Sequence, residues 1–167
     1  MKKNDLITLC RVAVLIALEI VLSRFLSLNT PVLRVGLGFV PIALCGIMFG
    51  PVWAGAAGAI ADILGTLISG NAIFPPLTIT AILTGISFGA FLHRKNARFF
   101  PNVVLCTLVN TVGLSLCLQT YWLSLLQHLQ YGVLFLTRLA QCGVLVVLYL
   151  TLLPLLQKLA VKLNYSK

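Results

Sequence analysis

The sequence predicts an all-α integral membrane protein that folds as a single bundle of six transmembrane helices. Of the 167 residues, 60% are hydrophobic and only 9% are charged, whereas a soluble domain carries about 25% charged residues. The chain therefore has too few polar residues to cover a core in water, and lipid must surround most of it. Since one bilayer crossing needs roughly 20 mainly apolar residues, we expect about six crossings within one domain, residues 1–167.

Proline, glycine and short polar stretches divide the apolar chain into six expected helices. The first helix ends before the turn-forming Asn29, Thr30 and Pro31, and Pro51 fits the first turn of the third helix. The second segment is short for a straight crossing, so we expect it to be kinked or shielded by neighbouring protein. The expected helices cover about residues 6–27, 37–49, 51–69, 76–92, 102–123 and 130–158.

The positive charges predict the orientation of the bundle. Nine of the twelve lysine and arginine residues lie around the start of the first helix, between the fourth and fifth helices, or near the C-terminus. With six crossings these regions share one face, and the positive-inside rule makes that face, with both termini, cytoplasmic. We expect no nucleic-acid partner, because no basic stripe is interleaved with aromatic residues. The nine cations are Lys2, Lys3, Arg11, Arg94, Lys95, Arg98, Lys158, Lys162 and Lys167.

Three arginines remain on the other side of the membrane or within it. Arg24 lies near the end of the first helix, Arg34 in the first outer loop, and Arg138 within the sixth helix. An ionisable group at membrane depth is costly and marks a functional site by default. The alternatives stay open: Arg24 and Arg34 would extend to the outer interface, and Arg138 would form a structural ion pair.

The third helix predicts an inward-facing carboxylate. Ala54, Gly58 and Asp62 follow at i, i+4 and i+8, and a stripe of small residues lets helices approach closely, so this stripe faces the bundle. Asp62 either pairs with an arginine or binds a ligand through two N–H donors. Glu19 lies roughly opposite the small face of the first helix, and pairing with a polar neighbour is its simplest interpretation.

Two later helices and two outer segments add candidate contacts. Asn110 lies on the fifth helix with neighbouring threonines, and Gln141 shares a face with Arg138 on the sixth. Phe74 follows Asn71 in the stretch "SGNAIFPP" (69–76), where a double proline stiffens a loop that resembles part of a lid.

The aromatic pair at the end of the fifth helix has two interpretations. Trp122, preceded by Tyr121, suits the belt of aromatic side chains at a membrane interface. The alternative is a contact with the ligand.

Several motifs of reaction chemistry are absent from the sequence. The chain has no G-x-x-x-x-G-K-[ST] motif for ATP, no cluster of histidine, cysteine and carboxylate for a metal, and no nucleophile beside a base. The five cysteines lie in apolar segments without C-x-x-C spacing and suit buried apolar positions. We therefore expect neither an enzyme nor a cofactor.

These features together resemble a known family. The six short helices, the pattern Ala13-x-x-x-Ala17 and the stretch "RVGLGFVPIALCGIMFGPVWAGAAGAIADILG" (34–65) resemble the substrate-binding S component of an energy-coupling factor (ECF) transporter. The resemblance covers nearly the whole chain. The segments that resemble the folate-specific family are "LSRFLS" (22–27), "LRVGLGFVPIAL" (33–44) and "FGPVWAG" (49–55).

The resemblance implies a membrane protein that captures a vitamin outside the cell. It would associate with a transmembrane T component and two ATPases, and Ala13 and Ala17 would form the contact face for the T component. Hydrolysis of ATP belongs to these partners in the family. That division agrees with the absence of a P-loop from this sequence.

The candidate residues match the chemistry of folate. Its glutamate carries two carboxylates, which guanidinium groups bind bidentately, and its pterin offers N–H donors to Asp62. Aromatic side chains such as Phe39 would stack on the rings, and Gly36 would let the backbone approach the anion beside Arg34. The expected ligand-binding residues are Arg24, Arg34, Gly36, Phe39, Asp62, Asn71, Phe74, Asn110, Trp122 and Arg138.

Two other functions compete with folate binding. The chain would serve as an S component for another vitamin, such as thiamine or riboflavin, or as a helical membrane subunit or enzyme outside transport. Three outer arginines fit a dianionic ligand better than cationic thiamine.

Overall fold

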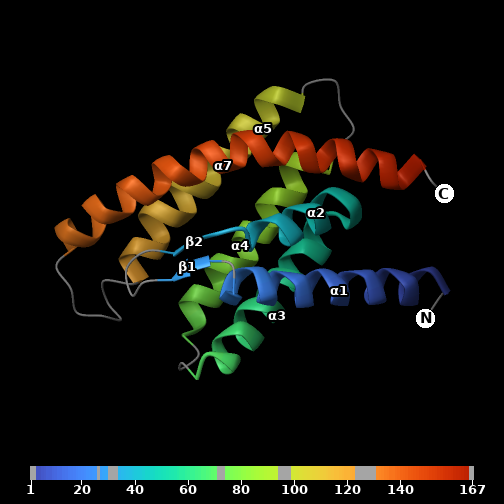
Figure 1. Ribbon diagram of the computed structural model, residues 1–167, viewed down its shortest axis with the longest axis horizontal. Coiled ribbons are helices and arrows are strands. Elements are labelled where there is room, and N and C mark those ends of the chain that lie inside the picture. Colours follow the sequence, from blue (N-terminus) through green and yellow to red (C-terminus); the bar gives the residue numbers. More distant parts are fainter. Residues whose placement is uncertain are drawn as a thin grey trace.

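The computed structural model confirms an all-α membrane fold (Figure 1). It describes residues 3–25, 27–29, 34–70, 74–93, 99–122 and 131–165. The elements are α1 (Lys3–Phe25), β1 (Ser27–Asn29), β2 (Arg34–Gly36), α2 (Phe39–Phe49), α3 (Pro51–Ile68), α4 (Pro75–Leu92), α5 (Phe99–Leu108), the π-helix η1 (Val109–Gln119) and α7 (Tyr131–Tyr165).

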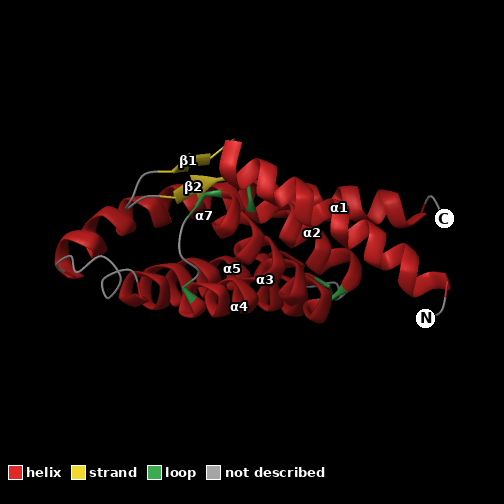
Figure 2. Ribbon diagram, turned by 90° about the horizontal axis from the view of Figure 1, so that it is seen from below, coloured by secondary structure: helices red, strands yellow, loops and turns green. Residues whose placement is uncertain are grey.

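The helices form two layers. Figure 2 shows α1, α2 and α7 above α3, α4 and α5, and the N-terminal end of α1 lies on the same side as the C-terminal end of α7. Among the described residues, five helical spans are long and apolar enough to cross a membrane. These spans are Leu6–Ser23, Pro51–Ile68, Pro75–Leu92, Pro101–Trp122 and Gln141–Lys158.

The short second helix is shielded by protein, which was one of its two expected solutions. α2 has 11 residues and packs against α1, α3, α4 and α7. Its Ala43 and Cys45 side chains are fully buried. Neighbouring helices therefore cover an element that is too short to cross the hydrocarbon region alone.

A short hairpin replaces part of the loop expected after the first helix. β1 pairs with β2 in antiparallel register, with Ser27 opposite Gly36 and Asn29 opposite Arg34. Extended backbone must satisfy its own N–H and C=O groups near lipid, and pairing achieves this. The hairpin lies against α7 and the end of α1 (Figure 2).

Small residues join α3 to α4, as the spacing of Ala54 and Gly58 predicts. A Cβ atom on Gly58 would lie 2.7 Å from the carbonyl oxygen of Ala81, and one on Gly85 would overlap the carbonyl oxygen of Ala54. Only glycine permits such an approach of two backbones. These helices therefore form a closely packed wall.

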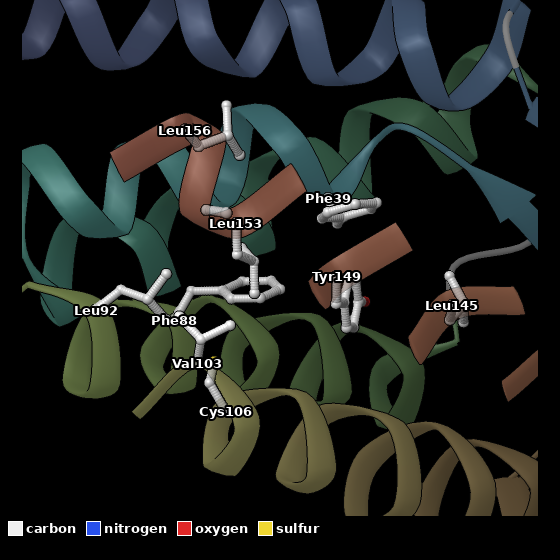
Figure 3. Close-up of a cluster of buried hydrophobic side chains, with 10 residues drawn as sticks. Phe39, Phe88, Leu92, Val103, Cys106, Leu145, Tyr149, Leu153 and Leu156 are labelled. Carbon is white, nitrogen blue, oxygen red and sulfur yellow. The ribbon is translucent and has the colours of Figure 1, made fainter. Parts of the chain in front are cut away.

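An aromatic cluster lies where α2, α4 and α7 meet (Figure 3). The ring centroids of Phe39 and Tyr149 are 4.4 Å apart at an interplanar angle of 72°, and Tyr149 meets Phe88 edge-on at 5.8 Å. Edge-to-face contacts of this kind fix ring orientations as well as filling space. The cluster ties the two layers together.

The fifth expected helix is not α-helical throughout. α5 ends at Leu108, and residues 109–119 continue as η1 with π-helical i→i+5 hydrogen bonds. An α-helix was expected over 102–123, because an apolar segment gives no local sign of this change. α7 is also longer than the expected 130–158, since it continues to Tyr165.

Candidate ligand-binding site

A cavity of about 250 Å³ opens between the two layers of helices. Both layers contribute to its wall, and β2 closes part of it through Gly36. Small-molecule sites are concave pockets of this kind, with a few polar groups set among apolar ones. Its polar lining residues are Glu19, Ser23, Asp62, Thr80, Thr84, Asn110, Ser115, Gln119, Gln141 and Tyr149.

Five helical elements supply these polar side chains, which is unusual for so apolar a chain. A polar group at membrane depth costs free energy unless it finds a hydrogen-bonding partner. Convergence of polar groups from α1, α3, α4, η1 and α7 on one cavity indicates a binding site. A ligand with polar edges would meet these groups.

The two acidic residues of the membrane spans both line the cavity. The chain has only three acidic residues, and two of them, Glu19 and Asp62, line this cavity. Oδ2 of the half-buried Asp62 accepts a hydrogen bond from Oγ1 of Thr78 at 2.9 Å. That is its only hydrogen bond to a described residue, so acceptor capacity remains for N–H donors.

Asn110 is held in one orientation by its neighbours. Its Oδ1 accepts from Oγ of Ser87 at 2.8 Å, and its Nδ2 donates to the carbonyl oxygen of Cys106 at 2.9 Å. An amide has two N–H donors and two acceptor positions. Nδ2 also donates to Sγ of Cys106 at 3.3 Å, so both N–H donors have partners within the protein and one acceptor position on Oδ1 remains for the cavity.

Two threonines on α4 present acceptors to the same cavity. Oγ1 of Thr80 donates to the carbonyl oxygen of Pro76 at 3.0 Å, and Oγ1 of Thr84 donates to that of Thr80 at 2.8 Å. Each hydroxyl has a single proton, which the helix backbone takes up. Both threonines therefore offer lone pairs, not protons, to a ligand.

The aromatic cluster forms an apolar part of the wall. Phe39 and Tyr149 both line the cavity, and they hold each other edge-to-face. Tyr149 is 7% exposed, and its hydroxyl makes no hydrogen bond to the described residues. This part of the wall suits a flat ring with a polar edge.

Four of the ten residues expected to bind ligand line the cavity: Gly36, Phe39, Asp62 and Asn110. Phe74 is the N-cap residue of α4 and half-buried, and it is not part of the wall.

Trp122 lies just beyond η1, against Tyr121 at a centroid distance of 5.3 Å, and it is also outside the wall. Its buried indole N–H has no acceptor among the described residues. Contact of Phe74 or Trp122 with a ligand stays a prediction.

The remaining expected residues fall outside what the structure describes. Asn71 lies outside the described residues, and so do the side chains of Arg24, Arg34 and Arg138. Their backbones belong to α1, β2 and α7. Arg34 stands two residues before Gly36 in β2, and Arg138 stands three residues before Gln141 in α7.

Several cavity residues escaped the sequence analysis. Glu19 was interpreted as a structural partner, yet it lines the cavity. Tyr149 lies eight residues after Gln141 with Leu145 between them, and this i, i+4, i+8 spacing on α7 is a signal that would have found it. Gln119 lies nine residues after Asn110, a spacing that no α-helical pattern places on one face.

The first helix carries an exposed apolar face. Ala13 and Ala17 are exposed, and so are their neighbours Val14 at 68% and Leu18 at 47%. This face lies away from the cavity, whose α1 contacts come from Glu19 and Ser23.

A helical membrane bundle with a polar cavity and an apolar outer surface defines the class of membrane-embedded solute-binding proteins. The model of the family described as "ECF transporter, substrate-specific component" matches residues 8–157, and the chain belongs to this family. Its members are the substrate-binding components of transporters and not enzymes, as the sequence predicted.

The chain is similar to proteins named folate transporter FolT. It is 42% identical over 130 residues to the one from Clostridium novyi (strain NT), covering 77% of this chain and 75% of that protein. It is 36% identical over 121 residues to the one from Leuconostoc mesenteroides, covering 70% of this chain and 63% of that one. A crystal structure of FolT bound with folic acid matches with a TM-score of 0.77 and 33% identity, covering 85% and 86% of the two chains.

Proposed function

We propose that this protein is the folate-binding S component of an ECF-type importer, which captures folate at the outer face of the membrane. The supporting observation is the cavity, which is lined both by the Asp62 carboxylate and by the Phe39–Tyr149 aromatic pair. The similarity to folate transporters and to a folic acid-bound structure supports the same ligand.

The proposed function gives each group a different task. The free acceptor positions of Asp62 take N–H donors of the pterin, and Oδ1 of Asn110 adds one more acceptor position. The pterin ring packs against Phe39 and Tyr149. Arg34, two residues before Gly36 of the wall, binds the glutamate carboxylates.

Arg24 and Arg138 add positive charge for the same anion. Arg24 follows Ser23 in the sequence, and Arg138 stands three residues before Gln141; Ser23 and Gln141 both line the cavity. Two carboxylates brought into a low-dielectric site need cationic partners, because an unpaired buried charge is costly. The alternative to ligand binding by Arg138 is a structural ion pair with Asp62.

Transport requires partners, and the face of α1 marks where they bind. Ala13 and Ala17 are exposed and remote from the cavity wall, so a T component packs there and two ATPases supply energy. Ala17→Trp should abolish folate uptake by the assembled transporter while the purified protein still binds folic acid. Equal loss of uptake and of binding would contradict this assignment.

We place both termini in the cytoplasm, because nine of the twelve lysine and arginine residues lie in sequence near the termini or between the fourth and fifth expected helices. Single thiols introduced by Lys95→Cys and Asn71→Cys, in a background without native cysteines, should label from opposite sides with an impermeant reagent. Labelling of the Lys95→Cys variant from outside intact cells would reverse the orientation.

A vitamin panel tests the ligand itself. The purified protein is titrated with folic acid, pteroic acid, thiamine and riboflavin by calorimetry. Saturable binding of folic acid, with none of thiamine or riboflavin, is the expected result. Binding of riboflavin or thiamine without folic acid would instead support an S component for another vitamin.

A further inference from the structure

We propose that the π-helical register of η1 makes Gln119 a ligand-binding residue, in a segment whose α-helical form would turn that side chain away from the cavity. Asn110 and Gln119 both line the cavity. Nine residues make two and a half turns of an α-helix, at 3.6 residues per turn. They make about two turns of a π-helix, at roughly 4.4 residues per turn, which brings both amides to one face.

The exposure of the rest of the segment follows the same period. Leu114 and Ser115 line the cavity between the two amides, four and five residues after Asn110. On the other side, Val112 is 47% exposed and Cys117, five residues later, is also exposed. Cavity-facing and exposed positions therefore both recur every four to five residues, as a π-helix requires.

Two anchors hold this register in place. At the start of η1, Asn110 is fixed by Ser87 of α4 and by the Cys106 carbonyl. At its end, Oγ1 of Thr120 donates to the carbonyl oxygen of Ser115, five residues earlier, at 3.3 Å. Asn110 therefore defines which face of η1 points to the cavity, and the π-helical spacing puts Gln119 on the same face.

The Gln119 amide has no hydrogen-bonding partner within the part of the chain that the structure describes. The side chain is half-buried and lines the cavity. A ligand that displaces water from the cavity must replace the hydrogen bonds that water makes to this amide, since a polar group left without a partner is unfavourable. A ligand with both donors and acceptors at its edge satisfies this amide, and such a ligand must be long enough to reach from Asn110 across two turns of η1.

This inference rests on the proposed function for the identity of the ligand, and the test compares two neighbouring side chains. An α-helix started at Asn110 would bring Cys117 to the cavity after seven residues, about two turns, in place of Gln119. We expect Gln119→Ala to weaken binding of folic acid to the purified protein about two- to tenfold, the range for one neutral hydrogen bond. We expect Cys117→Ala to change neither binding nor the thermal midpoint of the ligand-free protein.

Thiol labelling in membrane vesicles tests the register without any ligand. The thiol of Gln119→Cys, in the Cys117→Ala background, should react with a charged thiosulfonate reagent, because the cavity is open to water. Native Cys117 in the unchanged protein should not react, because it faces lipid; labelled peptides are identified by mass. Folic acid should slow the reaction at position 119.

The outcomes separate the two proposals. If the protein binds no folic acid but labelling follows the expected pattern, the register stands and the proposed function fails. If Cys117 reacts and the thiol at position 119 does not, the register is wrong whatever the ligand. If folic acid binds and Gln119→Ala leaves its affinity unchanged, the role of Gln119 in binding is overturned.

Discussion

Two parts of the cavity wall are built in different ways. α3 and α4 are regular α-helices whose backbones touch through glycine, with Gly58 and Gly85 at the contacts. η1 is a π-helix, and a Cβ atom on its Gly113 would meet nothing within 4 Å. The first part is a rigid support that carries the Asp62 carboxylate. The second presents the amides of Asn110 and Gln119 at the π-helical spacing of four to five residues. Closely packed α-helices therefore present one set of polar groups to the cavity, and a π-helix presents another.

Alanine substitutions at one glycine of each part measure this difference most directly. Gly85→Ala places a methyl group on the carbonyl oxygen of Ala54, and backbone atoms move less easily than side chains. Overpacking of this kind costs about 3 kcal/mol of unfolding free energy. Gly113→Ala meets open space and should be neutral or slightly stabilising, because alanine favours helix.

Thermal unfolding of the two purified variants in detergent provides the measurement. The midpoint should fall strongly for Gly85→Ala and stay within a few degrees of the unchanged protein for Gly113→Ala. Similar midpoints for both variants would show that α3 and α4 are no more tightly packed than η1.

The same contrast explains how much the sequence could predict. The inward face of α3 followed from Ala54, Gly58 and Asp62, because small residues at i, i+4 and i+8 share a face in any α-helix. Asp62 does line the cavity. Gln119 could not be placed in this way, because its position depends on hydrogen bonds in the i→i+5 register, which the side chains of an apolar segment do not specify.

Tyr149 and the hairpin differ in how far the sequence could predict them. Tyr149 was predictable in principle from its spacing to Gln141 on one face of α7. The pairing of Asn29 with Arg34 was not, because three-residue strands carry too little alternation to be distinguished from a loop. The positions of such strands depend on the helices that they join.

Removing the Asp62 carboxylate, the acceptor that α3 presents to the cavity, should have the next largest effect. Asp62→Asn replaces a carboxylate that accepts twice with an amide that also donates, so folic acid and pteroic acid should both bind about 10- to 150-fold more weakly. Thr78→Val, which removes the hydrogen bond to Oδ2 of Asp62, should have a smaller effect in the same direction. Calorimetric affinities check both variants, and unchanged pteroic acid binding in Asp62→Asn would remove Asp62 from the pterin site.

The hairpin beside the cavity provides a third element for comparison. Arg34→Ala should weaken folic acid binding by about 10- to 150-fold, since a charge-assisted hydrogen bond contributes about 1.5–3 kcal/mol. Pteroic acid lacks the glutamate and should lose far less. Should both ligands lose the same factor in parallel titrations, Arg34 does not bind the glutamate carboxylates.

The smallest expected effect lies at the hydrogen bond that joins the two parts of the wall. Ser87 of α4 is buried and outside the cavity lining, and its Oγ donates to Oδ1 of Asn110 in η1 at 2.8 Å. Ser87→Ala removes the donor to Oδ1 and leaves the Asn110 amide held only through Nδ2, by the carbonyl oxygen and Sγ of Cys106. The acceptor that faces the cavity is then less firmly fixed. We expect folic acid affinity to fall about two- to tenfold, the range for one neutral hydrogen bond.

A matched serine separates orientation from general destabilisation. Ser69 also donates to a backbone carbonyl, that of Gly65 at 3.0 Å, but it lies at the exposed end of α3. Ser69→Ala should leave the affinity unchanged, and Asn110→Ala should weaken binding at least as much as Ser87→Ala. Oγ of Ser87 also lies within hydrogen-bond distance of the carbonyl oxygen of Thr84, at 2.8 Å. If Ser87 affects binding only through Asn110, the double variant should bind no more weakly than Asn110→Ala alone. Additive losses in calorimetric titrations would mean that Ser87 supports the cavity in some other way, and that the two parts of the wall are not coupled through this hydrogen bond.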